Sequence, residues 1–287
     1  IQNKDLFNSI ISGLIPFGAI FGAPFAGTLA GYGRRRAMII ITLMAVFGCS
    51  LASIFNFYML FIGRLILGIC VGCYITVCPL IVSEIAPKPL IGPWGVMNQV
   101  MVGLGILTTV TVGFVEPYEE SLAAKTSTFW EVALFMPAIV GIIQVLLLTF
   151  IFTFDTPKYY QIQHDKDNYE KSMSKIYNHG TDIYQTLDEN LLKNNEGEDD
   201  SKHNSQDLTF KQLFSYPHRK PLMVGLVLAT FHQTTGISSI TFFSNEIFTQ
   251  GLSGTEAELA GRIGTFGNGI AALAAAFTAF AFAKMYG

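Results

Sequence analysis

The residues best suited to chemistry in this sequence are polar side chains that interrupt long apolar runs. The densest group spans residues 232–239, where His232, Gln233, two threonines and two serines surround Gly236. Imidazole, amide and hydroxyl groups donate and accept hydrogen bonds, which suits a ligand rich in hydroxyl groups. A glycine among small hydroxyl residues within an apolar helix is typical of a discontinuous helix that lines a cavity. The group therefore predicts a polar ligand path, although a hydrogen-bond network between helices explains each residue alone equally well.

Three further polar residues lie in apolar runs, namely Arg64, Glu84 and Gln99. Ionisable and amide side chains are costly within a membrane, so each residue is a candidate for function. The amide of Gln99 suits hydroxyl groups, whereas Arg64 fits either a structural ion pair or a transport role. Glu84 has no obvious partner in the sequence, and its carboxylate could instead reach the membrane interface. Phe242 and Phe243 follow the densest polar group and offer apolar faces on which a ligand ring could pack.

The elements that position these residues are predicted to be membrane-spanning helices. Apolar residues make up 51% of the chain and charged residues 14%. The apolar runs are each about 20 residues long, which is the length a helix needs to cross a bilayer. Backbone polar groups in lipid must be satisfied within the segment, so an all-α polytopic bundle is expected. The seven predicted spans are 9–30, 36–56, 59–83, 94–115, 130–153, 221–243 and 261–283.

A polar stretch from Asp155 to Lys220 separates the fifth predicted span from the sixth. Residues 194–205 have the composition of a disordered segment, and residues 167–177 predict a short amphipathic helix. If the spans alternate in direction, this stretch lies on the same side of the membrane as Arg34 and its two neighbouring arginines. The opposite side is acidic, so the positive-inside rule places the basic side in the cytoplasm.

Small residues in the spans predict close helix packing. The glycine pairs that allow helix backbones to approach are Gly18 with Gly22, Gly27 with Gly31, and Gly68 with Gly72. Cys70 and Cys73 form a C-x-x-C pattern, which redox and zinc sites also use. No second liganding pair accompanies them and they lie within a span, so they are interpreted as packing residues. Neither a metal nor a cofactor is expected.

Five motifs, in order along the chain, resemble those of the sugar porters of the major facilitator superfamily. They are Gly33-Arg34-Arg35, Arg64-x-x-x-Gly68-x-x-x-Gly72, Pro79 to Pro87, Asp155-Thr156-Pro157-Lys158, and His232 to Ser238. The resemblance implies a major facilitator fold, of which this chain would hold helices two to eight of twelve. Residues 1–153 would then be most of the N-terminal half, 154–220 a cytoplasmic linker domain, and 221–287 the start of the C-terminal half.

The resemblance also implies roles for individual residues. The expected substrate-binding residues are Gln99, His232, Gln233, Ser238, Phe243 and Asn268. The expected gating and structural residues are Gly33, Arg34, Arg35, Arg64, Glu84, Pro87, Asp155, Pro157 and Lys158. The chain departs from the family at three pocket positions: His232 replaces a glutamine, Ser238 an asparagine, and Ala272 the usual asparagine of helix eight.

The function implied by the resemblance is transport of a hexose or a similar small polar solute by alternating access, in the plasma membrane. Alternatives are a non-transporting relative, acting as a nutrient sensor or a structural subunit of a membrane complex, and a carrier for a polyol or an organic acid. Coupling to protons stays open, because the acidic residue used by proton symporters lies on helix one of the family. The net charge of −3 argues against a nucleic-acid partner. No constellation of nucleophile and base is visible, so an enzyme is not expected. The sequence leaves the oligomeric state open.

Overall fold

The computed structural model describes residues 2–54, 56–87, 90–114, 129–177, 219–252 and 254–286, and its regular elements are α-helices. The chain forms two compact units. One unit comprises Ile1–His179 with Leu273–Gly287, and the other comprises Gly180–Ala272. The all-α class predicted from the sequence is confirmed. Residues 194–205, predicted to be disordered, lie outside the described residues.

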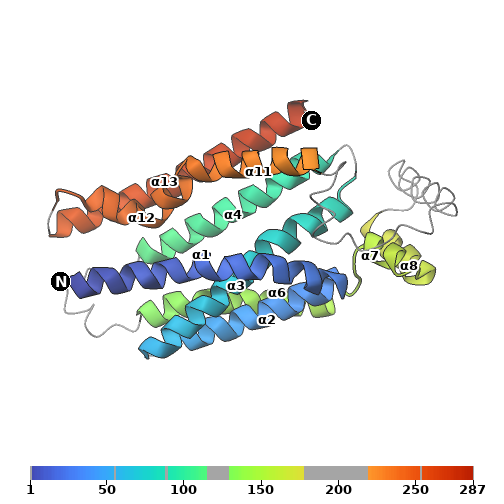
Figure 1. Ribbon diagram of the computed structural model, residues 1–287, viewed down its shortest axis with the longest axis horizontal. Helices are drawn as coiled ribbons and strands as arrows, with labels where there is room; N and C mark the ends of the chain where they lie inside the picture. Colours follow the sequence, from blue (N-terminus) through green and yellow to red (C-terminus); the bar gives the residue numbers. More distant parts are fainter. Residues whose placement is uncertain are drawn as a thin grey trace. The chain divides into compact units, whose positions relative to one another are not determined.

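The first unit is a bundle of long helices (Figure 1). They are α1 (Gln2–Gly31), α2 (Arg34–Ala52), α3 (Phe57–Ile85), α4 (Ile91–Phe114) and α6 (Phe129–Phe150). Helix α1 packs along α3, and α2 packs between α3 and α6. Two short helices, α7 (Pro157–Ile162) and α8 (Lys166–Ile176), lie past the end of this bundle (Figure 1). Helix α8 confirms the amphipathic helix predicted at residues 167–177.

The contact between α1 and α3 depends on glycine. A Cβ atom on Gly18 would lie 2.7 Å from the carbonyl oxygen of Leu65, and one on Gly68 would lie 2.5 Å from that of Ile15. Cβ atoms on Gly22 and Gly72 would likewise overlap the backbone of the facing helix. Two of the three predicted glycine pairs therefore form close helix contacts, as expected for small residues in membrane bundles.

The third predicted pair does not form such a contact. A Cβ atom on Gly27 or Gly31 would meet no atom within 4 Å in the described part of the chain. The prediction was wrong because small residues permit close approach without requiring a neighbour. Cys70 and Cys73 do pack as predicted: both are free and buried in the core between α1, α2 and α3, and the Cys73 thiol donates to the Gly22 carbonyl at 3.2 Å.

The second unit contains α11 (Arg219–Thr234), α12 (Ile237–Thr249) and the part of α13 (Thr255–Tyr286) up to Ala272. The span predicted at 221–243 is not one continuous helix, since the structure divides it between α11 and α12. Gly236 separates them with φ of 73°, in the left-handed region that favours glycine. The discontinuous helix expected from the polar composition is therefore present. The hydroxyl groups of Ser244 and Thr265 lie 3.2 Å apart and link α12 to α13.

Six helices are long and apolar enough to cross a bilayer, counted over the described residues. They are Ser9–Gly31, Arg34–Ala52, Phe57–Ile85, Ile91–Phe114, Ala133–Phe150 and Thr255–Met285. The last begins earlier than the span predicted at 261–283. Helices α11 and α12, with 16 and 13 residues, are each shorter than the usual span. The chain is an integral multi-pass membrane protein.

Candidate functional site

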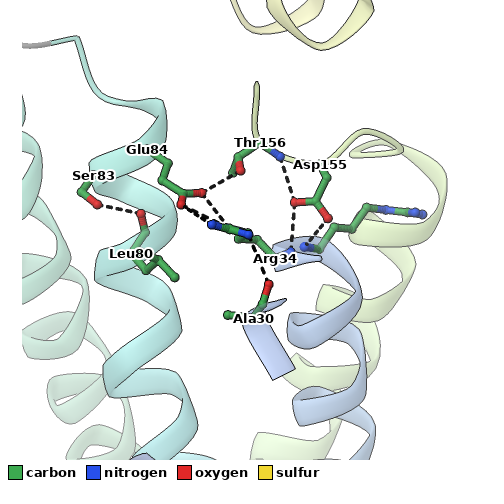
Figure 2. Close-up of polar contacts among 8 residues, drawn as sticks. Ala30, Arg34, Leu80, Ser83, Glu84, Asp155 and Thr156 are labelled. Carbon is green, nitrogen blue, oxygen red and sulfur yellow. Dashed lines mark hydrogen bonds and ion pairs between the residues drawn. The ribbon is translucent and has the colours of Figure 1, made fainter. Parts of the chain in front are cut away.

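A buried polar cluster lies in the first unit where α2 begins and α3 ends (Figure 2). We call it the α2 cluster and define it as Arg34, Glu84, Asp155 and Thr156. Arg34 is the first residue of α2, Glu84 lies in the last turn of α3, and Thr156 is the N-cap of α7. Asp155 lies between α6 and α7. The cluster therefore joins three segments that are distant in the sequence, namely the start of α2, the end of α3 and the loop before α7.

The central contact of the α2 cluster is an ion pair between Arg34 and Glu84. Arg34 Nη2 lies 2.7 Å from Glu84 Oε1, and Nε lies 2.9 Å from Oε2, so the pair is bidentate. Only 11% of the Arg34 side chain and 2% of the Glu84 side chain are exposed. Buried charges are tolerated only when their remaining hydrogen-bonding capacity is satisfied. The Thr156 hydroxyl donates to Glu84 Oε2 at 2.7 Å, and Arg34 Nη1 donates to the Ala30 carbonyl at 3.3 Å.

Asp155 binds the backbone at the start of α2. Its Oδ1 accepts the N–H of Arg34 at 3.0 Å, and its Oδ2 accepts the N–H of Arg35 at 3.1 Å. Oδ1 also accepts the N–H of Thr156 at 2.9 Å. The first N–H groups of a helix have no partner within the helix, so a carboxylate there satisfies them and offsets the positive end of the helix dipole. The Asp155 side chain therefore caps the start of α2, although it comes from a distant part of the chain.

Arg35 makes the reciprocal contact with the end of α6. Its Nε donates to the Leu148 carbonyl at 2.8 Å, and its Nη2 donates to the Thr149 carbonyl at 3.4 Å. The last carbonyl groups of a helix lack partners in the same way as the first N–H groups. The start of α2 and the end of α6 therefore cap each other through Asp155 and Arg35.

Gly33 allows Asp155 to approach α2. It precedes the helix as the N-cap residue with φ of 125°, in the region that L side chains rarely adopt. A Cβ atom at this position would lie 2.8 Å from Asp155 Oδ2. Both the backbone conformation and the close approach therefore require glycine here, which gives a physical reason for the Gly-Arg-Arg motif.

Helices α7 and α8 hold the α2 cluster from outside the bundle. Pro157 is buried at the first position of α7, and the Ser172 hydroxyl of α8 donates to the Asp155 carbonyl at 2.7 Å. The Tyr177 hydroxyl donates to the Ile85 carbonyl at the end of α3, and burial raises the pKa of Tyr177 above its ordinary value. The neutral, donating form of this tyrosine is thereby favoured. The loop after α6 is thus fixed between the bundle and α8.

Arg64, Lys158 and Pro87 are predicted gating residues whose side chains make no hydrogen bond to the α2 cluster within the described part of the chain. Arg64 is half-buried in α3, 20 residues before Glu84, or about 30 Å along the helix. Among the described residues it makes neither an ion pair nor a hydrogen bond, so the structural ion pair considered for Arg64 is not seen there. Lys158 is exposed on α7. Pro87 is buried just after α3 ends, where it cannot continue the helix.

The predicted substrate-binding residues fall in both units. Gln99 lies on α4 in the first unit and is exposed. His232 and Gln233 lie in the last turn of α11, and Ser238 and Phe243 lie on α12; all four are exposed. Asn268 is half-buried on α13. The structure therefore brings His232, Gln233 and Ser238 to the break between α11 and α12.

The side chains at this break form no hydrogen bonds to other helices within the part of the chain that the structure describes. Among the described residues, His232, Gln233 and Ser238 make no side-chain hydrogen bond, whereas the Thr234 and Thr235 hydroxyls bond to carbonyls within their own helix. A network between helices, which the sequence left open, is therefore not formed by the described residues.

A family model described as "Sugar (and other) transporter" matches residues 2–287. The chain belongs to this sugar transporter family. The hexose transporter 1 of Plasmodium vivax is a similar curated protein, 31% identical over 88% of this chain and 51% of that protein. The human facilitated glucose transporter member 4 of solute carrier family 2 is 32% identical over 75% of this chain and 41% of that protein. The chain thus spans about half the length of the curated relatives it matches.

Solved structures show the same fold as this sugar transporter family member. A double-tryptophan mutant of XylE aligns with a TM-score of 0.70 at 20% identity, over 88% of this chain and 54% of that one. The xylose transporter XylE from E. coli, in a partially occluded inward open conformation, aligns with a TM-score of 0.57 at 16% identity, over 96% and 76%. These matches confirm the predicted major facilitator fold.

The sequence did not reveal two features of the site. Glu84 was left without a partner, which was wrong: Arg34, 50 residues earlier, pairs with it. Thr156 was not singled out, although it donates to Glu84. The sequence did contain a signal for this contact, because Thr156 places a hydroxyl group between Asp155 and Pro157 in one of the five motifs. Only the folded chain shows that α2 begins where α3 ends.

Proposed function

We propose that the protein containing this chain carries a hexose or a similar small polar solute across the plasma membrane by alternating access. The observation that carries this proposal is the break between α11 and α12, with its unengaged polar side chains at His232, Gln233 and Ser238. Membership of the sugar transporter family and the hexose transporters among the relatives support the solute class.

In this proposal the solute hydroxyl groups bind to polar side chains from both halves of the protein. Gln99 contributes from the N-terminal half. Gln233, His232 and Ser238 contribute from the C-terminal half with Asn268, and the ring of Phe243 packs against the solute. Hydrogen bonds to several neutral groups give weak binding that a carrier can reverse. The imidazole of His232 and the short hydroxyl of Ser238 would set the preference among sugars.

The α2 cluster acts in this proposal as a structural joint on the cytoplasmic side. Its contacts tie the ends of α2, α3 and α6 to α7, so the helices of this half move together when the halves rock. The basic loops support the cytoplasmic assignment of this end. The linker domain of residues 154–220, which connects the two halves in the sequence, then lies in the cytoplasm.

The test is uptake of labelled hexoses into liposomes that contain the full-length protein. Gln233→Ala should raise the KM for the preferred sugar about tenfold, because one or two hydrogen bonds of about 1 kcal/mol each are lost. Gln250→Ala is the matched control, since Gln250 is an exposed glutamine at the far end of α12. Equal kinetics for the two variants would contradict the assignment of Gln233.

The same assay separates the alternatives. Saturable sugar binding without uptake by folded protein would support a nutrient sensor and overturn the transporter. Uptake of a polyol or an organic acid in preference to hexoses would change the solute class. Proton coupling would appear as uptake against a concentration gradient that collapses when the pH gradient is removed.

A further inference from the structure

Three consecutive arginines occupy the first turn of α2, where no acidic residue accompanies them. Positive side chains at this end of a helix are unfavourable, because the helix dipole is positive there. Glu84 compensates Arg34, and the carbonyl groups at the end of α6 compensate Arg35. Arg36 is exposed and makes no ion pair or hydrogen bond within the described ranges. Among the described residues, the third arginine therefore lacks a partner for its side chain, whereas Arg34 has a carboxylate and Arg35 has two carbonyl groups.

Arg36 lies at the end of an exposed apolar stripe of α2. Ile40, Leu43 and Phe47 follow it at the spacing of one helix face, and they are 42%, 53% and 59% exposed. Helix α2 is one of the membrane-spanning helices, so this uncovered apolar face is suited to lipid chains. Arg36 lies in the first turn of this candidate span, and the end of a span is where lipid headgroups lie.

The neighbouring helix α6 packs against one side of α2 and exposes apolar residues of its own. A Cβ atom on Gly141 of α6 would lie 2.9 Å from the Val46 side chain, so the two helices are in close contact. Among the exposed apolar residues of α6 are Ile139, Ile143, Leu146 and Phe150, at 49%, 51%, 50% and 75%, on the face opposite Gly141. Phe150 ends α6 at the same end of the bundle as Arg36, as the contacts of Arg35 with Leu148 and Thr149 show.

We propose that Arg36 binds the phosphate of an anionic phospholipid in the leaflet at this end of the bundle, with an acyl chain along the exposed apolar stripe of α2. A guanidinium presents paired N–H donors whose geometry matches two phosphate oxygens. A single carbonyl group or water molecule would satisfy these donors less completely. The occupant is a phospholipid because Arg36 and the apolar stripe of Ile40, Leu43 and Phe47 lie on one face of the membrane-spanning helix α2. This site is separate from the α2 cluster, whose charges are already paired.

The test measures lipid binding to the purified full-length protein. Native mass spectrometry and thermal unfolding are followed as phosphatidylglycerol, phosphatidylcholine or soluble glycerol phosphate is added. Phosphatidylglycerol should bind and raise the midpoint of unfolding, and Arg36→Gln should weaken that binding about fivefold, the loss expected for one cation at a lipid surface. Lys171→Gln is the matched control, because it removes one exposed positive charge from α8 without touching the stripe.

Each other outcome overturns the proposal. Equal loss in Arg36→Gln and Lys171→Gln would mean that net charge attracts the lipid without a site. Equal stabilisation by glycerol phosphate and by phosphatidylglycerol would show that the acyl chains do not contribute to binding. Unchanged lipid affinity in Arg36→Gln, with the wild-type midpoint of unfolding in phosphatidylcholine, would exclude Arg36 altogether.

Discussion

The carboxylate of Asp155 accepts the backbone N–H of Arg34 at 3.0 Å, across a separation of 121 residues. The N-cap residue of α2 is Gly33, which has no side chain with which to cap the helix. The first turn holds three arginines and no acidic residue, so the negative charge must come from elsewhere in the chain. Asp155 supplies it, and Arg35 in return caps the end of α6.

Replacing Asp155 tests this cap directly. Asp155→Ala removes three backbone hydrogen bonds to a buried carboxylate and should lower the stability of the protein by about 3 kcal/mol. Asp155→Asn should cost about half as much, because its amide oxygen can still accept from Arg34 while its nitrogen cannot accept from Arg35. The midpoint of thermal unfolding in detergent measures both effects. An alanine variant as stable as the asparagine variant would show that the bonds to α2 contribute little.

Gly33 should be intolerant of any side chain. Gly33→Ala forces a Cβ atom to 2.8 Å from Asp155 Oδ2 and places alanine at φ of 125°, so a loss of about 3 kcal/mol is expected. Gly27→Ala is the control, because a Cβ atom there meets nothing within 4 Å and alanine favours the helix. It should lie within about 1 kcal/mol of wild type. Similar unfolding midpoints for the two variants would contradict the close approach of Asp155.

The ion pair between Arg34 and Glu84 should show strong coupling in a double-mutant cycle. Either single alanine substitution leaves a buried charge without its partner, at a cost of about 3 to 5 kcal/mol. The double variant should be little worse than either single one, which gives a coupling energy of about 3 kcal/mol. Arg36→Ala combined with Glu84→Ala is the control and should be additive within about 0.5 kcal/mol. Additive effects at Arg34 and Glu84 would mean that the pair is not formed in the membrane-embedded protein.

Periodicity and hydropathy predicted the helices well because burial in lipid imposes one strong rule on every span. The exception was the run at 221–243: hydropathy alone gave one continuous span, whereas the glycine and hydroxyl residues within it indicated the break that the structure has at Gly236. The glycine pairs of α1 and α3 were predictable from spacing, whereas the open surroundings of Gly27 depend on which helices are neighbours. The partner of Glu84 could not be predicted for the same reason. The sequence shows which residues are charged, but the contact between Arg34 and Glu84 depends on how the helices pack in three dimensions.

Asp165 should make the start of α8 sensitive to acid. Its Oδ2 accepts from Asn168 Nδ2 at 2.6 Å and its Oδ1 accepts from the Asn168 N–H at 3.2 Å, and these bonds hold its pKa below the ordinary value. A depressed pKa in the folded state means that the cap contributes its full stability above about pH 4, the ordinary value for aspartate. This contribution is lost as the pH falls through the lower folded value. Hydrogen exchange of the α8 amides, corrected for its intrinsic pH dependence, should therefore distinguish wild type from Asp165→Asn at neutral pH and converge in acid. A difference that persists unchanged in acid would show that the charge of Asp165 does not hold the helix.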